Sequence, residues 1–414
     1  MRIIALATLL TSILSSPAHA AENWTQFRGP NGDGKAVAAK LPLEWSETKN
    51  VKWKIPIHGR SWSSPVVWGD QLWLTTATKD GKKMSVVCLD RHTGKVIHDL
   101  LLYENEKPDF CHPTNTYASP TPVIEEGRIY VHFGRYGTAC IDTKTAKTLW
   151  SRSDFKCDHW RGPGSSPVLA GDRLIVAYDG FDFQFVVALD KNTGKTVWKK
   201  DRDIKYGTDN GDRKKAYCTC AVFEHKGRMQ VVSPSAVETI CYDPKQGDVL
   251  WRVRHGGMNA AARPIYGHGL VYIAAGSGPT AMIAVRPDGK GDVTKTHIAW
   301  KYGKSAPKRP SQILSGDWLF MINDSGVISC IDAKTAAIVW QKRVGGDYRA
   351  SPILADGKIY FFSQKGVSPV IEAAGEFKLL ATNKLDGGFQ ASPAVVGNSL
   401  YLRTEKNLYC IEAK

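Results

Sequence analysis

Four cysteines lie in connecting segments of the chain, where thiols could do chemistry. They are Cys111, Cys157, Cys218 and Cys220. His112 and His159 stand beside the first two, so three outcomes are open: a disulfide between neighbouring loops, a soft-metal site of thiolates and imidazoles, or unpaired thiols. The spacing of Cys218 and Cys220 is not the C-x-x-C of zinc or redox motifs. We therefore predict no metal site, and a disulfide among these four stays one possible pairing.

Cationic and aromatic side chains recur in the segments that precede a repeated Ser-Pro or Thr-Pro pair. Three residues before each proline or its equivalent stand Trp62, Ser119, Gly164, Tyr217, Ala261, Arg309, Arg349 and Gln390. With their close neighbours they give the candidate ligand-binding residues Arg60, Trp62, Asn115, Tyr117, His159, Trp160, Arg161, Arg263, Arg309, Arg349 and Gln390. If the segments meet at one opening, they form a cationic mouth with aromatic walls, which suits a ligand rich in carboxylate or sulfate groups. The alternative is a scattered basic surface.

The elements that carry these segments belong to one internal repeat. Each copy starts with a small residue and proline, then a short apolar strand, a turn with Gly or Asp, and a second strand. With the proline or its equivalent as a marker, the eight copies are marked by Pro65, Pro122, Pro167, Cys220, Pro264, Gln312, Pro352 and Pro393. The spacings between markers are 57, 45, 53, 44, 48, 40 and 41 residues. A period of this size indicates a repeat architecture.

The second half of the repeat reads Asp-x-x-Thr-Gly-Lys-x-x-Trp. Its clearest copy runs from Asp190 to Trp198, and related copies end at Trp150, Trp251 and Trp340. Together the two halves hold four short strands with turn residues between them. A period somewhat above forty residues with four strands predicts an all-β, eight-bladed β-propeller with four antiparallel strands per blade.

Five further cysteines occupy one repeated position on the third strand of a copy. They are Cys88, Cys140, Cys241, Cys330 and Cys410. Ala188 and Ala284 stand at the same position in other copies, which indicates a small buried slot. Since buried free cysteine behaves as a small apolar residue, we expect these five thiols to be shielded from solvent.

The two ends of the chain predict how the ring closes. The last copy, 392–414, has room for only three strands and lacks its outer strand. Val51–Ile55 matches that missing strand and carries Trp53 at the tryptophan position. We expect Val51–Ile55 to pair with Leu408–Ile411, because ring closure by an N-terminal strand removes exposed strand edges.

Three parts are predicted along the chain: a signal peptide over 1–20, an N-terminal extension over 21–49 and a single propeller over 50–414. The predicted blades cover 58–105, 117–155, 162–203, 216–256, 260–303, 309–345, 349–385, and 389–414 with 50–57. The signal peptide is inferred from Arg2, the apolar stretch Ile3–Leu14 and an Ala-x-Ala site ending at Ala20. It predicts a periplasmic or secreted protein. Beyond residue 20 no apolar run approaches the length of a membrane span.

Composition and charge narrow the choice of partners. Apolar residues make up 43% and charged residues 23%, which suits a globular protein rather than a disordered or fibrous one. The net charge of +15 favours anionic partners, but export argues against a nucleic acid. We expect an anionic small molecule, a polysaccharide or a partner protein, bound by a monomer.

The Asp-x-x-Thr-Gly-Lys-x-x-Trp units resemble pyrroloquinoline-quinone (PQQ)-like β-propeller repeats. The opening segment Trp24–Gly32 also resembles secreted proteins with such repeats, so the resemblance covers residues 24–414. Repeats of this kind occur in quinoprotein dehydrogenases and in the propeller lipoprotein of outer-membrane assembly. The resemblance implies that the outer-strand tryptophans dock between neighbouring blades. It implies little about function, since the same repeats serve enzymes and scaffolds.

The resemblance also raises PQQ as a cofactor. Alcohol-oxidising quinoproteins of this kind carry two adjacent cysteines, hold calcium with Glu and Asn side chains, and use an Asp base. This sequence has no Cys-Cys pair and no recognisable calcium site, and Asp158 and Asp347 are single acids in loops before markers. PQQ therefore stays an unsupported cofactor, and we identify no catalytic residue. The sequence favours a non-catalytic binding or scaffold protein that presents the mouth to an anionic ligand or partner protein. The alternative is a PQQ-dependent oxidoreductase with a reduced cofactor site.

Overall fold

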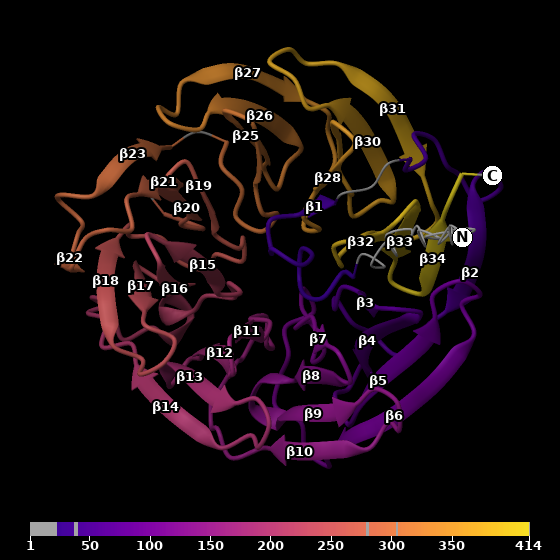
Figure 1. Cartoon of the computed structure of the whole chain (residues 1–414), viewed down its shortest axis with the longest axis horizontal. Helices are drawn as coiled ribbons and strands as arrows, with labels where there is room; N and C mark the ends of the chain where they lie inside the picture. The colour runs from indigo at the N-terminus through magenta and orange to yellow at the C-terminus, as the bar shows by residue number, and fades with distance from the viewer. Residues whose placement is uncertain (1–22, 37–39, 279–280, 304, 414) are drawn as a thin grey trace, which may run out of the picture.

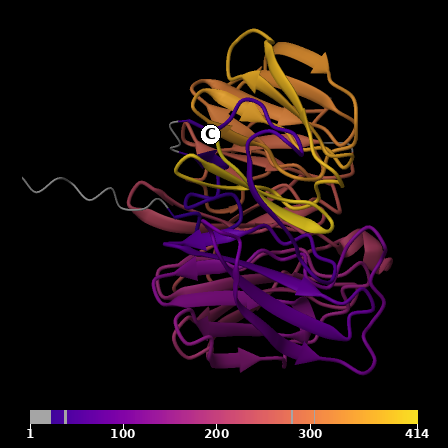
Figure 2. The same cartoon turned by 90° about the vertical axis from the view of Figure 1, so that its right-hand side faces the viewer.

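Eight blades, each built on four antiparallel strands, surround one central axis (Figure 1). The computed structural model describes residues 23–36, 40–278, 281–303 and 305–413, so the predicted signal peptide lies outside the described residues. Seen from the side, the last blade (yellow) lies directly beside the first blade (purple) (Figure 2). Within the described ranges, no helix is long and apolar enough to cross a membrane. The prediction of an all-β, eight-bladed propeller is confirmed.

The first four blades follow one another along the chain. Blade 1 holds β3 (Val66–Trp68), β4 (Gln71–Ala77), β5 (Lys83–Asp90) and β6 (Val96–Glu104). Blade 2 holds β7 (Val123–Glu125), β8 (Arg128–His132), β9 (Thr138–Asp142) and β10 (Thr148–Arg152). Blade 3 holds β11 (Val168–Ala170), β12 (Arg173–Asp179), β13 (Gln184–Asp190) and β14 (Thr196–Asp201). Blade 4 holds β15 (Ala221–His225), β16 (Arg228–Pro234), β17 (Glu238–Tyr242) and β18 (Val249–Arg254). Two short 3-10 helices, η1 (Gly134–Tyr136) and η2 (Gly211–Lys214), lie in connections.

The remaining four blades complete the ring. Blade 5 holds β19 (Ile265–Gly267), β20 (Leu270–Ala274), β21 (Met282–Val285) and β23 (Ile298–Tyr302). Blade 6 holds β24 (Ile313–Ser315), β25 (Trp318–Ile322), β26 (Val327–Asp332) and β27 (Ile338–Arg343). Blade 7 holds β28 (Ile353–Ala355), β29 (Lys358–Tyr360), β30 (Val367–Glu372) and β31 (Leu379–Lys384). Blade 8 holds β32 (Ala394–Val396), β33 (Ser399–Arg403), β34 (Asn407–Ile411) and β2 (Val51–Pro56). β1 (Lys35–Ala36) and β22 (Gly291–Asp292) add parallel strands to β28 and β18.

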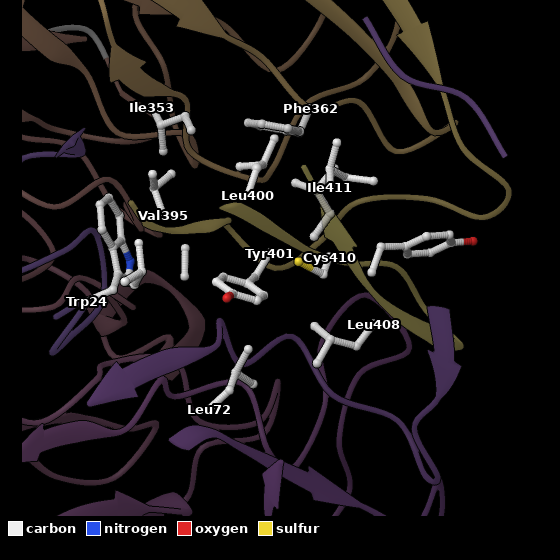
Figure 3. Packing of buried hydrophobic residues seen from close by; sticks show 14 of the residues in the cluster. Trp24, Leu72, Ile353, Phe362, Val395, Leu400, Tyr401, Leu408, Cys410 and Ile411 are labelled. Carbon is white, nitrogen blue, oxygen red and sulfur yellow. The ribbon is translucent and has the colours of Figure 1, made fainter. Parts of the chain in front are cut away.

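The ring closes as expected, by pairing of the N-terminal strand with the last one. β2 runs antiparallel to β34, with Trp53 opposite Cys410 and Ile55 opposite Leu408. The indole nitrogen of Trp53 donates to the carbonyl of Arg91 in blade 1 at 3.1 Å. Apolar side chains of the two blades pack behind this junction, with Leu72 of blade 1 facing the side chains of blade 8 (Figure 3). The first and last blades are therefore joined by both backbone pairing and core packing.

The Asp-x-x-Thr turns explain why the repeat keeps these residue types. The Asp190 carboxylate accepts hydrogen bonds from the backbone and hydroxyl of Thr193, both at 2.9 Å, and from the backbone of Asn192. Asp90, Asp142 and Asp332 have the same arrangement. These bonds lower the pKa of Asp190, with the Thr193 hydroxyl as the main cause. A short local side chain thus satisfies the donors of the tight turn.

The outer-strand tryptophans dock onto the turns of the next blade. The indole nitrogen of Trp150 donates to the Lys191 carbonyl at 2.9 Å, and its ring lies against Gly194. Gly194 has φ +70°, and a Cβ atom there would lie 2.6 Å from that ring, so only glycine fits. Trp198, Trp300 and Trp340 bond the next blade in the same way.

Trp251 differs from the other docked tryptophans. It packs between blades 4 and 5, but its nitrogen donates to Gln230 of its own blade at 3.0 Å. The reason is local: the third-to-fourth strand connection of blade 5 contains β22 and has no Asp-x-x-Thr-Gly turn to receive the indole.

The apolar core lies between blades rather than within them. Most core clusters join side chains from neighbouring blades, such as Trp150 and Cys140 of blade 2 with Leu174 and Val187 of blade 3. All five cysteines of the repeated third-strand position are fully buried, which confirms the small buried slot. Burial raises the pKa of Cys140 to about 12, so this thiol remains protonated.

Candidate functional site

The N-terminal segment crosses the central axis of the ring (Figure 1). Trp24 exchanges two backbone hydrogen bonds with Val67 of blade 1, and Ile124 of blade 2 donates to the Thr25 carbonyl. At the other end, Leu354 of blade 7 donates to the Gly34 carbonyl, and β1 continues beside β28. We call residues 23–36 the plug, since they connect the innermost strands of blades 1 and 2 to the innermost strand of blade 7. Sequence analysis assigned this stretch to an extension and did not place it in the centre.

Two buried arginines hold the plug. Arg28, 1% exposed, donates to the carbonyls of Gln312 and Asp33, both at 2.6 Å. Arg263, 2% exposed, donates to the Phe27 carbonyl at 2.6 Å and to the side chain of Gln26 at 2.9 Å. Burial lowers the pKa of Arg28 to about 9 and that of Arg263 to about 10, so both remain charged at neutral pH.

A cavity of about 290 Å³ lies next to the plug, and Phe27 of the plug forms part of its wall. We call this cavity the cup. All eight positions found three residues before the markers line it: Trp62, Ser119, Gly164, Tyr217, Ala261, Arg309, Arg349 and Gln390. The plug instead bonds to innermost-strand positions at or just after the markers. The loops of all eight blades therefore meet at one mouth, and the plug forms the base.

The candidate residues divide into two groups. Those that line the cup are Trp62, Asn115, Arg161, Arg309, Arg349 and Gln390. Arg60 lies beside it, with its guanidinium 4.9 Å from the centre of the Trp62 ring. Every candidate that stands three residues before a marker lines the cup, as the repeat register predicted.

The other four candidates lie away from the cup, which corrects the prediction of where they sit. Arg263 stands one residue before its marker, and its buried side chain holds Phe27 from below. Tyr117 is buried and donates to the Asp109 carbonyl at 2.6 Å. The half-buried ring of His159 stacks on Tyr178, and Trp160 packs against Phe110 and Phe181. Tyr117, His159 and Trp160 belong to long loops, where distance from a marker no longer fixes the direction of a side chain, whereas Arg263 stands too close to its marker to reach the mouth.

The cations of the cup differ in their partners. Arg161 forms two hydrogen bonds with Asp212, at 2.7 and 2.8 Å, and Arg309 forms one with Asp324 at 2.6 Å. Arg349 donates to the Thr114 carbonyl at 3.0 Å and has no carboxylate partner among the described residues. Burial lowers the pKa of Arg349, and the nearby Arg309 adds to this shift. Lys308 also lines the cup, whereas no Asp or Glu of the described chain does.

A ring of hydroxyls lies between the mouth and the plug, and sequence analysis missed it. The residue directly before the marker is Ser or Thr in seven blades: Ser64, Thr121, Ser166, Thr219, Ser311, Ser351 and Ser392. Each hydroxyl oxygen accepts the backbone N–H of the equivalent residue in the preceding blade, at 2.9 to 3.0 Å. We call this ring the crown. Arg263 takes the eighth position and interrupts it. The repeated Ser or Thr before proline was the signal that could have revealed it.

The four loop cysteines are free thiols in the structure, as are the other five. The Cys218 thiol lies 3.3 Å from the Ala262 carbonyl, and the Cys157 thiol lies 3.8 Å from Nδ1 of His159. The disulfide left open above is thus not formed. In the part of the chain that the structure describes, no group of three or more His, Cys, Asp or Glu side chains could hold a metal ion.

The sequence matches one protein-family model along almost its whole length. The model is that of outer membrane protein assembly factor BamB, and it matches residues 38–200, 89–342 and 182–414. Among curated proteins, outer membrane protein assembly factor BamB of Moranella endobia (strain PCIT) is 24% identical over 218 residues, which are 48% of this chain. The chain spans about half, 52%, of the length of that relative.

Solved structures share the fold at low sequence identity. BamB from Moraxella catarrhalis has a TM-score of 0.61 at 13% identity, covering 87% of this chain and 98% of that one. Quinohemoprotein alcohol dehydrogenase from Comamonas testosteroni has a TM-score of 0.69 at 11% identity, covering 96% and 82%. A protein named as an assembly factor and an alcohol dehydrogenase thus share this architecture, so the side chains of the cup must decide between functions.

Proposed function

This chain belongs to the outer membrane protein assembly factor BamB family, and from this premise we propose that it is a non-catalytic binding or scaffold protein. Its cup takes an anionic ligand or an acidic part of a partner protein at the mouth. The relatives are named for assembly of outer membrane proteins, which favours a partner protein in the periplasm or outside the cell. The predicted signal peptide agrees with that location.

One observation carries the proposal: the cup collects cations and excludes carboxylates. Arg161, Arg309 and Arg349 come from blades 3, 6 and 7, and Lys308 stands beside Arg309. Because no carboxylate of the described chain lines the cup, its field favours an anion. The half-buried guanidinium of Arg349 can donate to an incoming carboxylate or sulfate with less competition from water than a surface side chain. Trp62 offers an apolar wall beside it.

The residues of the cup do not fit the calcium-held quinone of the alcohol-oxidising relatives. Calcium is bound by oxygen ligands, carboxylates above all, and the described cup lining holds no carboxylate. It also holds no cysteine, and Asp212 and Asp324, which lie behind the lining, are bonded to Arg161 and Arg309. The likeness to quinoproteins therefore supports the fold and gives no residue to a dehydrogenase mechanism.

Binding of a labelled acidic peptide tests the proposal. We would titrate a fluorescent hexaglutamate peptide into the protein and into the variant Arg309→Ala/Arg349→Ala. Each lost charge-assisted hydrogen bond should cost on the order of 1.5–3 kcal/mol if desolvated and less if exposed, so we expect binding to weaken roughly tenfold or more. Added salt should weaken binding as well, since screening acts on partly exposed charges.

The matched control is Lys79→Ala/Lys82→Ala, which removes two exposed cations outside the cup. Equal losses in both variants would mean that bulk charge attracts the peptide, and no loss in either would place binding elsewhere on the molecule.

A second experiment tests the alternative function. The unmodified protein is mixed with PQQ and calcium, and its absorbance spectrum is recorded. Saturable quinone binding with dye-linked alcohol oxidation would favour the dehydrogenase instead.

A further inference from the structure

The crown lies at the base of the cup, where the structure brings its hydroxyls into the cavity wall. Ser64, Thr121, Ser166, Thr219, Ser351 and Ser392 line the cup, and Ser311 does not. We infer that these six hydroxyls of the crown, without Ser311, form an oxyanion-binding site that receives a carboxylate, sulfate or phosphate group through the mouth. This inference rests on the proposed function and names the chemical group that the cup selects.

Hydrogen bonding fixes the direction in which the hydroxyls can act. Each crown oxygen already accepts a backbone N–H from the preceding blade, so a lone pair is used and the O–H group is left to donate. Ser351 donates to Ser311 at 3.2 Å. The other five crown hydroxyls that line the cup are those of Ser64, Thr121, Ser166, Thr219 and Ser392. None of their hydroxyl hydrogens has a protein acceptor in the described part of the chain. The base of the cup is therefore a set of converging donors, the arrangement that an oxyanion needs.

The charges around the crown act in the same direction. Above it, Arg349 and Lys308 line the cup, and neither forms an ion pair within the described chain. Below it, Arg263 bonds to carbonyl and amide oxygens and to no carboxylate. Because the Arg263 guanidinium is buried and charged, its field is weakly screened and reaches the base of the cup. Donors in the wall and cations on both sides favour a negative group over a neutral or positive one.

The plug makes this site possible. Without residues 23–36, the axis would lead past the crown rather than end there. Phe27 lines the cup, and its carbonyl is fixed by Arg263 at 2.6 Å. Gly32 lies so close to the Arg263 guanidinium that a Cβ atom would clash with it, and its φ of +68° also favours glycine. The motif Phe27–Gly32 thus fits the residue that interrupts the crown.

Isothermal titration with small oxyanions tests the inference on the full mature protein. We would titrate sulfate, phosphate and glucuronate at constant ionic strength set with chloride, with glucose as the neutral partner of glucuronate. We expect saturable one-to-one binding of at least one oxyanion and none of glucose. Sulfate or phosphate alone would identify a tetrahedral group, and glucuronate alone would identify a carboxylate.

The chain offers a matched pair of variants. Ser166→Ala and Ser311→Ala both remove a buried crown hydroxyl that accepts one backbone N–H, but only Ser166 lines the cup. We expect Ser166→Ala to weaken oxyanion binding roughly tenfold or more, as for loss of one hydrogen bond to a charged group. Ser311→Ala should change it less than about twofold. If Ser166→Ala fails to fold in a melting experiment, Ser392→Ala replaces it.

The outcomes separate this inference from the proposed function. Equal effects of the two serine variants, or no binding of any oxyanion, would overturn the crown as a site. Binding of hexaglutamate that depends on Arg309 and Arg349 would still support the mouth in that case. Oxyanion binding that is lost in Ser166→Ala, together with peptide binding that ignores both arginines, would keep the crown and overturn the proposed mouth.

Discussion

Arginines at the two ends of the central axis differ in burial and in their hydrogen-bond partners. At the plug, Arg28 and Arg263 are almost fully buried, and carbonyl or amide oxygens of the protein take up their donors. At the mouth, Arg309 keeps 48% of its side chain exposed, and Arg349 has no acidic partner among the described residues. The same residue type stabilises the fold at one end and is available to a ligand at the other. Position along the axis, and not residue type, separates the two roles.

The net charge of the chain does not distinguish buried arginines from exposed ones. All four arginines contribute equally to the net charge of +15. A buried guanidinium is out of reach of a ligand at the mouth, but its charge still acts through the protein interior. Stability and binding should therefore respond to different substitutions.

Deletion through residue 57 should have the largest effect, because it removes both the plug and β2. The last blade would lose its pairing at Trp53 and expose an open edge. We expect the Tm to fall by more than about 10 °C, or cooperative unfolding to be lost, relative to a chain that begins at Asn23. Equal melting of the two chains by calorimetry would contradict both the closure and the structural role of the plug.

The pair Arg263→Met and Arg349→Met tests the comparison itself. Loss of Arg263 leaves the Phe27 and Cys220 carbonyls without their donor, so the free energy of unfolding should fall by about 2–4 kcal/mol. Arg349→Met removes a half-buried group with one bond to a carbonyl and should lower it by less than about 1 kcal/mol. Chemical denaturation of both variants measures the difference. Equal losses would mean that the two ends of the axis are not distinct.

Acidification should act through His255, in the segment that leads to Asn259 and Ala261 of the cup. Its Nδ1 accepts the Gly257 N–H at 3.3 Å, so Nε2 donates to the Thr239 hydroxyl at 3.1 Å and the ring is neutral. Burial lowers the pKa of His255 from 6.5 to about 4. The unfolded chain binds the proton more readily in this window, so stability is lost as pH falls from about 6.5 towards 4.

At pH 5 the effect of this one group should be about 2 kcal/mol, from about 1.4 kcal/mol per pH unit. We expect His255→Gln to be less stable than the parent at pH 7.5 and to show a shallower decline between pH 6.5 and 5. Melting curves across this range measure both slopes. An unchanged slope in the variant would show that other groups control acid stability.

Sequence reasoning succeeded where the repeat imposes a register. The Pro markers and the Asp-x-x-Thr-Gly turns recur at fixed positions within a blade, so they predicted eight blades, the closing strand and the eight positions that line the cup. The same register explains why Arg263 was misplaced. It stands two residues closer to its marker than the mouth positions, which moves its side chain from the mouth to the base of the axis.

The rest could not be read from the repeat because it lies outside it. The plug has no counterpart in any blade, and its path depends on contacts with Gln312 and Leu354, about 300 residues away in the chain. Trp160 and His159 lie in a long loop whose aromatic neighbours determine their direction. The crown was visible as Ser or Thr before the marker, but its role appears only when eight blades bring these residues into one ring.

The most direct test of the account is a crystal soaked in selenate, an analogue of sulfate with a strong anomalous signal. We expect a selenium peak in the cup, above Phe27, within hydrogen-bond reach of the crown hydroxyls of Ser64, Ser166 or Ser392, and no such peak in a crystal of Ser166→Ala/Ser392→Ala. Selenium peaks found only on the outer surface of the blades, with the cup holding none at saturating selenate, would contradict it.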